Sequence, residues 1–223
     1  MSVAENIRKF RELVPSDVQI VAVSKFHPAE MILEAYNAGQ KTFGESRVQE
    51  FVEKVKVLPE DISWHFIGHL QTNKVKQIIG KTALIESVDS DRLLDLIDKE
   101  SEKAGVVSDI LLQLHVAMEE AKFGFYPSEL KEYLDSGKYK DLKNVRIRGF
   151  MGMASNTDNE DRVRKDFHTL HDFFEEVKNN KEYDLPHFDY LSMGMSGDWQ
   201  IAVEEGSNIV RIGSAIFGDR YYG

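Results

Sequence analysis

Short runs of apolar residues recur along this chain, and most of them end abruptly in a polar or charged side chain. The first run, residues 19–24, is rich in valine and isoleucine, a composition typical of a strand that is buried on both faces. Lys25 follows this run directly, and Pro28 suits the first turn of a helix. Parallel α/β proteins bind their ligands at the carboxyl ends of the strands. Lys25 is therefore predicted to lie at the ligand-binding face of the fold.

The same alternation of a strand and a helix continues to the end of the chain. We predict eight strands, at residues 19–24, 41–44, 64–68, 83–88, 109–116, 146–151, 190–194 and 208–213. We predict helices at residues 3–13, 29–38, 48–55, 72–79, 128–134, 158–177 and 196–202, around 93–97, and after Gly213. Each strand is therefore followed by a helix or by a short helical segment.

Eight βα units that fill the chain predict an α/β fold, a single (β/α)8 TIM barrel over residues 1–223 with an N-terminal lead-in helix. The alternative is a doubly wound open sheet. It is less favoured because residues 24–27, the first turn, lack a glycine-rich phosphate-binding fingerprint. In the barrel, all strands open on one face, so the polar residues at their ends are predicted to lie together.

Composition and charge narrow the range of partners. The formal net charge of -10 disfavours a nucleic-acid groove or an anionic membrane as the main partner. The chain has no cysteine, which excludes disulfides and thiolate chemistry. No apolar stretch has the length of a signal core or a membrane span, so we expect a cytoplasmic protein. His168 and His171 have a spacing that suits a metal, but no third ligand is evident and we expect no metal site.

The ends of the last two predicted strands carry small residues and hydroxyl groups. Residues 193–198 contain Ser196 between glycines, and Gly213 is followed by Ser214. TIM barrels often bind phosphate with the loops after strands seven and eight, where backbone N–H groups point at the anion. Turn formation alone would also explain these residues. The presence of small residues and hydroxyl groups in both loops favours a phosphate site.

Two cations accompany this phosphate site. Lys25 either extends to solvent or, if desolvation lowers its pKa, serves as a nucleophile that forms a Schiff base. Arg211 lies within the apolar last strand, where it needs a partner. That partner is either a buried carboxylate such as Glu86 or a ligand atom. The combination suggests pyridoxal 5'-phosphate, with its aldehyde at Lys25, its phosphate at the two serine loops and its pyridine nitrogen at Arg211.

Six ordered motifs carry a resemblance to a known family. They are residues 21–25 (VAVSK), 43–50 (FGESRVQE), 64–71 (WHFIGHLQ), 148–154 (RGFMGMA), 191–198 (LSMGMSGD) and 210–218 (VRIGSAIFG). Together they resemble the pyridoxal phosphate homeostasis protein family, which is similar in fold to the N-terminal barrel of alanine racemase, of fold type III. The resemblance implies one set of cofactor-binding residues: Lys25 as the Schiff-base lysine, Ser46, Met151, Ser196, Arg211, Gly213 and Ser214. The family usually has asparagine where Ser46 stands and a small residue where Phe26 stands.

The resemblance also implies a function. Members of this family bind pyridoxal phosphate, buffer it and hand it over, so we expect a carrier with no catalytic activity and transient contacts with PLP-dependent apoenzymes. The chain ends after the eighth unit, without the domain that gives a racemase its opposing tyrosine, and we expect a monomer. The alternative is a slow PLP-dependent amino-acid racemase with water, or a rim residue such as His69 or Tyr126, as second base. A third possibility, a barrel that only binds proteins, requires Lys25 to be inert.

Overall fold

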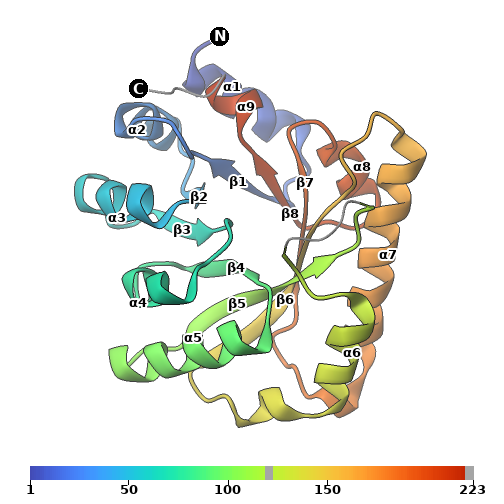
Figure 1. Cartoon of the computed structure of the whole chain (residues 1–223). Helices are drawn as coiled ribbons and strands as arrows, with labels where there is room; N and C mark the ends of the chain where they lie inside the picture. The colour runs from blue at the N-terminus through green and yellow to red at the C-terminus, as the bar shows by residue number, and fades with distance from the viewer. Residues whose placement is uncertain (119–122, 219–223) are drawn as a thin grey trace.

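Eight parallel strands close into a barrel in the computed structural model, which describes residues 1–118 and 123–218 (Figure 1). Each strand pairs with the next in the sequence, and the last pairs with the first. The strands are β1 (Gln19–Val23), β2 (Thr42–Glu45), β3 (Ser63–Phe66), β4 (Leu84–Val88), β5 (Ser108–His115), β6 (Val145–Met153), β7 (Tyr190–Met195) and β8 (Ile209–Ile212). This confirms the predicted (β/α)8 barrel.

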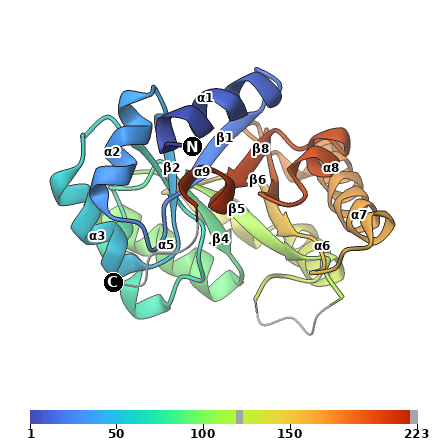
Figure 2. The same ribbon diagram turned by 90° about the horizontal axis from the view of Figure 1, so that it is seen from above.

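Helices surround the barrel on the outside (Figures 1 and 2). They are α1 (Val3–Leu13), α2 (Ala29–Asn37), α3 (Val48–Val57), α4 (Val75–Ile78), α5 (Asp91–Ala104), α6 (Pro127–Asp135), α7 (Glu160–Asn179), α8 (Trp199–Glu204) and α9 (Ser214–Phe217). Three 3-10 turns accompany them: η1 (Thr72–Lys74), η2 (Lys138–Asp141) and η3 (Lys181–Tyr183). The lead-in helix α1 packs beside α9 at the other end of the chain, where the Asn6 amide donates to the Ile216 carbonyl over 2.9 Å.

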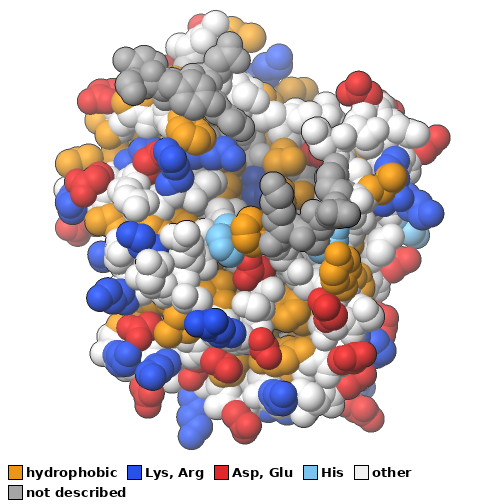
Figure 3. All heavy atoms as spheres, viewed as in Figure 1, with side chains coloured by type: hydrophobic (Ala, Val, Ile, Leu, Met, Phe, Trp, Pro, Cys, Tyr) orange, Lys and Arg blue, Asp and Glu red, His pale blue; other side chains and the backbone are white. Residues whose placement is uncertain are grey.

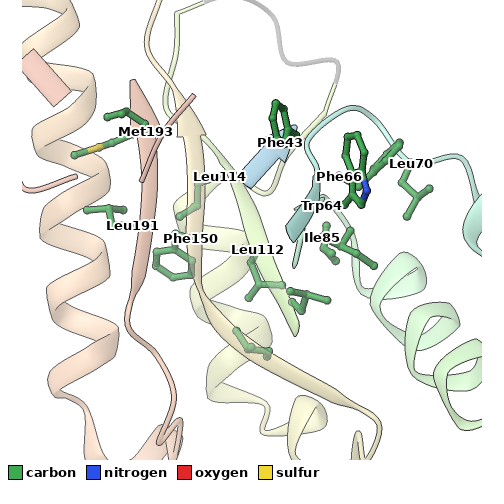
Figure 4. Packing of buried hydrophobic residues seen from close by; sticks show 14 of the residues in the cluster. Phe43, Trp64, Phe66, Leu70, Ile85, Leu112, Leu114, Phe150, Leu191 and Met193 are labelled. Carbon is green, nitrogen blue, oxygen red and sulfur yellow. The ribbon is translucent and has the colours of Figure 1, made fainter. Parts of the chain in front are cut away.

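The main hydrophobic core lies between the strands and the helices. Strand residues alternate between the two faces of the barrel wall, so every second side chain meets a helix. Phe43, Phe66 and Phe150 are fully buried in this outer layer, and Figure 4 shows several of its members. A smaller cluster fills the inside of the barrel: Val21, Leu84, Leu111, Met151 and Ile209. Side chains thus fill the inside of the barrel, and the remaining free space lies at the carboxyl ends of the strands.

Several boundaries differ from the sequence prediction. The predicted helix at 72–79 is the 3-10 turn η1 followed by a single turn of α4. The prediction that a helix starts at Ser196 is wrong, because residues 195–198 form a turn in which the Met195 N–H donates to the Asp198 carboxylate over 2.5 Å. Helix α8 therefore begins at Trp199. Within the described residues, no helix combines the length and the apolar character that crossing a membrane requires.

Candidate functional site

One cavity at the carboxyl ends of the strands has a volume of about 280 Å³, and we call it the Lys25 cavity. All seven residues expected at the cofactor line it: Lys25, Ser46, Met151, Ser196, Arg211, Gly213 and Ser214. The strand alternation explains the position of Lys25, since Val21 and Val23 precede it on the inner face. In Figure 3 hydrophobic and basic side chains meet at a recess in the upper half of the viewed face.

The floor of the Lys25 cavity is a buried arginine with fixed partners. Arg211 is 4% exposed, and it lies opposite Val21 in the pairing of β8 with β1. One guanidinium nitrogen donates to the Ser192 hydroxyl over 2.6 Å, and another donates to the Gly152 carbonyl over 2.8 Å. These two bonds orient the guanidinium plane while leaving it in contact with the cavity.

A fully buried carboxylate lies beneath this arginine. The Ser192 hydroxyl donates to Glu86 over 2.6 Å, and the His65 Nδ1 lies 2.6 Å from the other oxygen of Glu86. Burial acts to raise the pKa of Glu86, but the hydrogen bond from His65 and the charge of Arg211 hold this pKa below its usual value. The Arg211 Nη1 lies 3.7 Å from the carboxylate. The predicted ion pair with Glu86 is confirmed, and the same guanidinium also lines the cavity.

The two serine loops are bonded to each other at the opposite end of the Lys25 cavity. The Ser196 hydroxyl oxygen accepts the N–H groups of Gly213 over 3.2 Å and of Ala215 over 3.4 Å. The hydroxyl proton of Ser196 is thereby left to donate elsewhere. Gly194 allows the end of β7 to approach α8 closely, because its φ is +92° and a Cβ there would meet the Ala202 Cβ at 2.5 Å.

Behind Lys25, outside the barrel wall, lies a second buried charge network. The Lys54 ammonium donates to Glu45 over 2.6 Å and to the Ser24 carbonyl over 2.8 Å. Phe26 has a left-handed φ of 66°, and its N–H donates to Glu50 over 2.8 Å. This network fixes the residues on both sides of Lys25. Glu45 directly follows the predicted strand 41–44 and is therefore one of the polar strand-end residues expected to lie together, but its side chain is bonded to Lys54 and does not line the Lys25 cavity.

His27 is a cavity residue that the sequence reasoning missed. Its ring is 5% exposed and stacks on Phe217, with centroids 5.2 Å apart. Burial lowers the pKa of His27, with the nearby charge of Lys54 acting in the same direction, so the imidazole is neutral near pH 7. Its place two residues after Lys25 was the only signal in the sequence.

Gly68 determines how closely the ends of β2 and β3 approach. A Cβ at this position would lie 2.2 Å from the Ser46 carbonyl oxygen, so no larger residue fits without moving the loop.

The other strand-end residues lie apart from the Lys25 cavity. The His69 Nδ1 lies 3.0 Å from Asp89, and its ring stacks on Phe123. Tyr126 packs edge-on against His115 at the start of α6. His115 itself lines a neighbouring cavity. Neither His69 nor Tyr126, the two candidates for a second base, lines the Lys25 cavity.

His168, one of the two histidines of α7 whose spacing suits a metal, contacts carboxylates instead. The His168 Nδ1 lies 3.0 Å from Glu205, and its Nε2 lies 3.4 Å from Asp172. In the part of the chain that the structure describes, no group of three or more His, Asp or Glu side chains is arranged to hold a metal ion.

Comparisons with known proteins agree with the geometry. The family described as "Alanine racemase, N-terminal domain" matches residues 1–221. The pyridoxal phosphate homeostasis protein of Aquifex aeolicus is 43% identical over 205 residues, which cover 92% of this chain and 88% of that protein. The structure of PipY from Synechococcus elongatus PCC7942 with PLP bound is 35% identical, with a TM-score of 0.88 and coverage of 97% of this chain and 100% of that chain. An alanine racemase of Clostridium difficile 630 is 13% identical and shares the fold, with a TM-score of 0.75 over 98% of this chain and 59% of its own.

Proposed function

This chain belongs to the pyridoxal phosphate homeostasis protein family, and we propose on that basis that it binds pyridoxal 5'-phosphate in the Lys25 cavity. The observation that carries the proposal is the convergence of seven sequence-predicted residues on one cavity. Its volume of about 280 Å³ is close to the lower end of the usual range for ligand pockets, roughly 300–1,000 Å³. Residues 1–223 act as one cofactor-binding domain.

The donor groups of the Lys25 cavity suit the three polar ends of this cofactor. The hydroxyls of Ser196 and Ser214, with the backbone at Gly213, would hold the phosphate, and Ser46 and Met151 would contact the ring. Bound pyridoxal phosphate supplies an aldehyde that condenses reversibly with a primary amine. Lys25 supplies that amine from the end of β1, where the Lys54 and Glu50 contacts fix its neighbours.

Arg211 decides what the bound cofactor is used for. Its guanidinium, which stays protonated, would hold the pyridine nitrogen through an N–H group. A pyridine held in this way would be a poor electron sink, so the residue favours holding the cofactor over carbanion chemistry. Ser192 and Glu86 maintain the position of the guanidinium.

A carrier role follows from these features. Neither His69 nor Tyr126 is placed to act as a second base in the Lys25 cavity, which disfavours the racemase alternative. The protein holds pyridoxal phosphate as a cytoplasmic monomer and releases it to amines or, through transient contacts, to PLP-dependent apoenzymes.

Borohydride trapping tests this proposal. The wild type, Lys25→Ala and the exposed control Lys76→Ala are loaded with pyridoxal phosphate, reduced and mapped by mass spectrometry. We expect the reduced adduct on the Lys25 peptide in the wild type and in Lys76→Ala, and no site-specific adduct in Lys25→Ala. Adducts spread over surface lysines, equally in all three proteins, would overturn the proposal. Loss of the α-deuterium of alanine faster than with free cofactor would instead establish the racemase.

A further inference from the structure

A larger cavity lies beside the Lys25 cavity and shares part of its wall. Its volume is about 830 Å³, and Met153, Met195 and Gly197 line both cavities. It is built at the carboxyl ends of β5, β6 and β7, so it opens on the same face of the barrel. A volume of this size is within the range that holds a small organic ligand. We call it the acidic cavity.

The charged groups that line the acidic cavity are of one sign. Asp158, Glu160 and Asp198 contribute carboxyl groups, and the described lining residues include no lysine or arginine. One oxygen of Asp198 accepts the Met195 N–H. Burial raises the pKa of Asp198 and outweighs the opposing effects of the Met195 N–H bond and the charge of Arg211. The described lining residues therefore favour a cationic ligand and offer a carboxylate no counter-charge of their own.

Gln113 is an independent indication of a ligand. This residue is on β5, its exposure is 6%, and it lines the acidic cavity. Its backbone carbonyl accepts the Phe125 N–H, but among the described residues no hydrogen bond is formed by its side-chain amide. The amide lies at the wall of the cavity, where its carbonyl oxygen is an acceptor for an N–H group. His115 lies two residues further along the same strand face and lines the same cavity.

We propose that the acidic cavity binds an alkyl primary amine that takes over the cofactor from Lys25. The inference rests on the proposed function, because only the neighbouring Lys25 cavity gives the amine something to receive. The Gln113 amide oxygen and the carboxylates accept the ammonium N–H groups, and Met153 and Val163 contact the alkyl chain. Because no lysine or arginine is present among the described lining residues, the site selects an amine without a free carboxylate, such as a lysine side chain.

The exchange is balanced without any other reactant. A C=N bond forms between the cofactor's aldehyde carbon and the incoming nitrogen, and the C=N bond to the Lys25 nitrogen breaks. The protons given up by the incoming ammonium pass to the Lys25 nitrogen, and nothing is oxidised or reduced.

Calorimetry on the protein without cofactor tests the amine site directly. The probes are Nα-acetyl-lysine amide, n-butylamine, the uncharged analogue Nα-acetyl-norleucine amide and L-alanine, which carries a carboxylate. We expect Nα-acetyl-lysine amide to bind at least tenfold more tightly than the norleucine analogue or alanine. Equal affinity of butylamine assigns the site to small amines, whereas a preference for the lysine amide assigns it to polypeptides. Equal binding of the norleucine analogue, or tighter binding of alanine, would overturn the inference.

Matched variants locate the bound amine. Gln113→Leu replaces the amide with an apolar side chain and so removes its acceptor, and Glu160→Gln removes one charge. We expect Gln113→Leu to weaken binding of Nα-acetyl-lysine amide about tenfold and Glu160→Gln to weaken it about threefold. The exposed residues of α3 supply the controls, Gln49→Leu and Glu53→Gln, which should leave the affinity unchanged. Unchanged affinity in Gln113→Leu would contradict the inference.

The loaded protein separates this inference from the proposed function. With cofactor bound, Nα-acetyl-lysine amide should accelerate its release from the wild type and do so about tenfold less in Gln113→Leu, while borohydride still labels Lys25 in both. Normal labelling of Lys25 without amine binding refutes the acidic cavity alone. Absence of labelling in the wild type refutes the proposed function itself.

Discussion

Two fully buried glutamates lie on opposite sides of the same barrel wall. Glu86 is inside, where both of its oxygens have partners, namely His65 and the Ser192 hydroxyl that also binds Arg211. Glu45 is outside, where one oxygen is bonded to Lys54 and the other has no partner among the described residues. The two carboxyl groups are equally inaccessible to solvent, but only the inner one is fully satisfied.

This difference reverses the effect of burial. The pKa of Glu86 is held below its usual value by its partners, whereas burial raises the pKa of Glu45 and outweighs the attraction of Lys54. The inner glutamate thus keeps the charge that Arg211 requires. The outer glutamate helps to hold the Lys25 segment in position, and this role depends less on its charge. Burial alone does not determine the direction in which the pKa of a carboxyl group shifts, because the number of partners that the carboxyl group has determines that direction.

The largest effect is expected from removing the inner carboxylate. Glu86→Leu leaves the Arg211 guanidinium buried without a counter-charge, and breaking a buried pair in this way lowers the free energy of unfolding by about 3–5 kcal/mol. Urea unfolding of the cofactor-free protein measures this loss. The midpoint urea concentration should fall, while the slope of the unfolding free energy against urea concentration stays constant. Glu53→Leu on the exposed face of α3 should change stability by less than about 0.5 kcal/mol. A loss below about 1 kcal/mol for Glu86→Leu would show that Arg211 does not depend on Glu86.

A smaller effect is expected in the pH dependence of stability. Because the folded pKa of Glu45 lies above the reference value of 4.5, its contribution to stability grows as the pH falls from above that folded pKa to 4.5. Glu86 has the opposite sign, so its contribution is complete above pH 4.5 and is lost as the pH falls through its lowered folded pKa. Glu45→Gln should remove the gain in stability that occurs as the pH falls toward 4.5, a gain of about 1 kcal/mol per unit of pKa shift. It should keep the loss of stability below pH 4.5. Urea midpoints measured from pH 7 to pH 3.5 test this, and an unchanged rise in Glu45→Gln would contradict the assignment.

The smallest effect concerns the backbone that the outer network holds. Phe26 has a φ of 66°, which asparagine tolerates and a β-branched residue resists. Phe26→Val should therefore unfold at lower denaturant than Phe26→Asn, with a difference of about 1 kcal/mol. The same pair of substitutions at exposed Leu33 in α2 should differ little, because valine and asparagine have similar helix propensities. Equal stabilities of the two Phe26 variants would show that the left-handed conformation is not maintained.

The sequence was sufficient for the fold and for the main contacts of the Lys25 cavity. Each strand carries its own apolar run, and barrel closure follows from eight repeated units. Lys25 and Arg211 were predictable because a cation next to, or within, an apolar strand is unusual enough to identify.

The features that were missed depend on contacts between distant segments. Strand β2 is buried at all four positions, so no alternation of apolar and polar residues showed that Glu45 points outward. The bond from Phe26 to Glu50 spans 24 residues, and it forms only because α3, which packs on β2, reaches the segment that follows β1. The unpartnered amide of Gln113 likewise becomes visible only when the ends of β5, β6 and β7 enclose a cavity.

The hydrogen bonds that join the two serine loops also bear on how fast the site fills and empties. Since the Ser196 hydroxyl connects residues 213 and 215 directly, the two loops hold each other in position by their own hydrogen bonds, which preorganises them for the phosphate. We expect loading to be limited by encounter with free cofactor, and unloading by the covalent bond at Lys25. A site with such kinetics acts as a reservoir whose content follows the supply of cofactor and the demand of nearby amines.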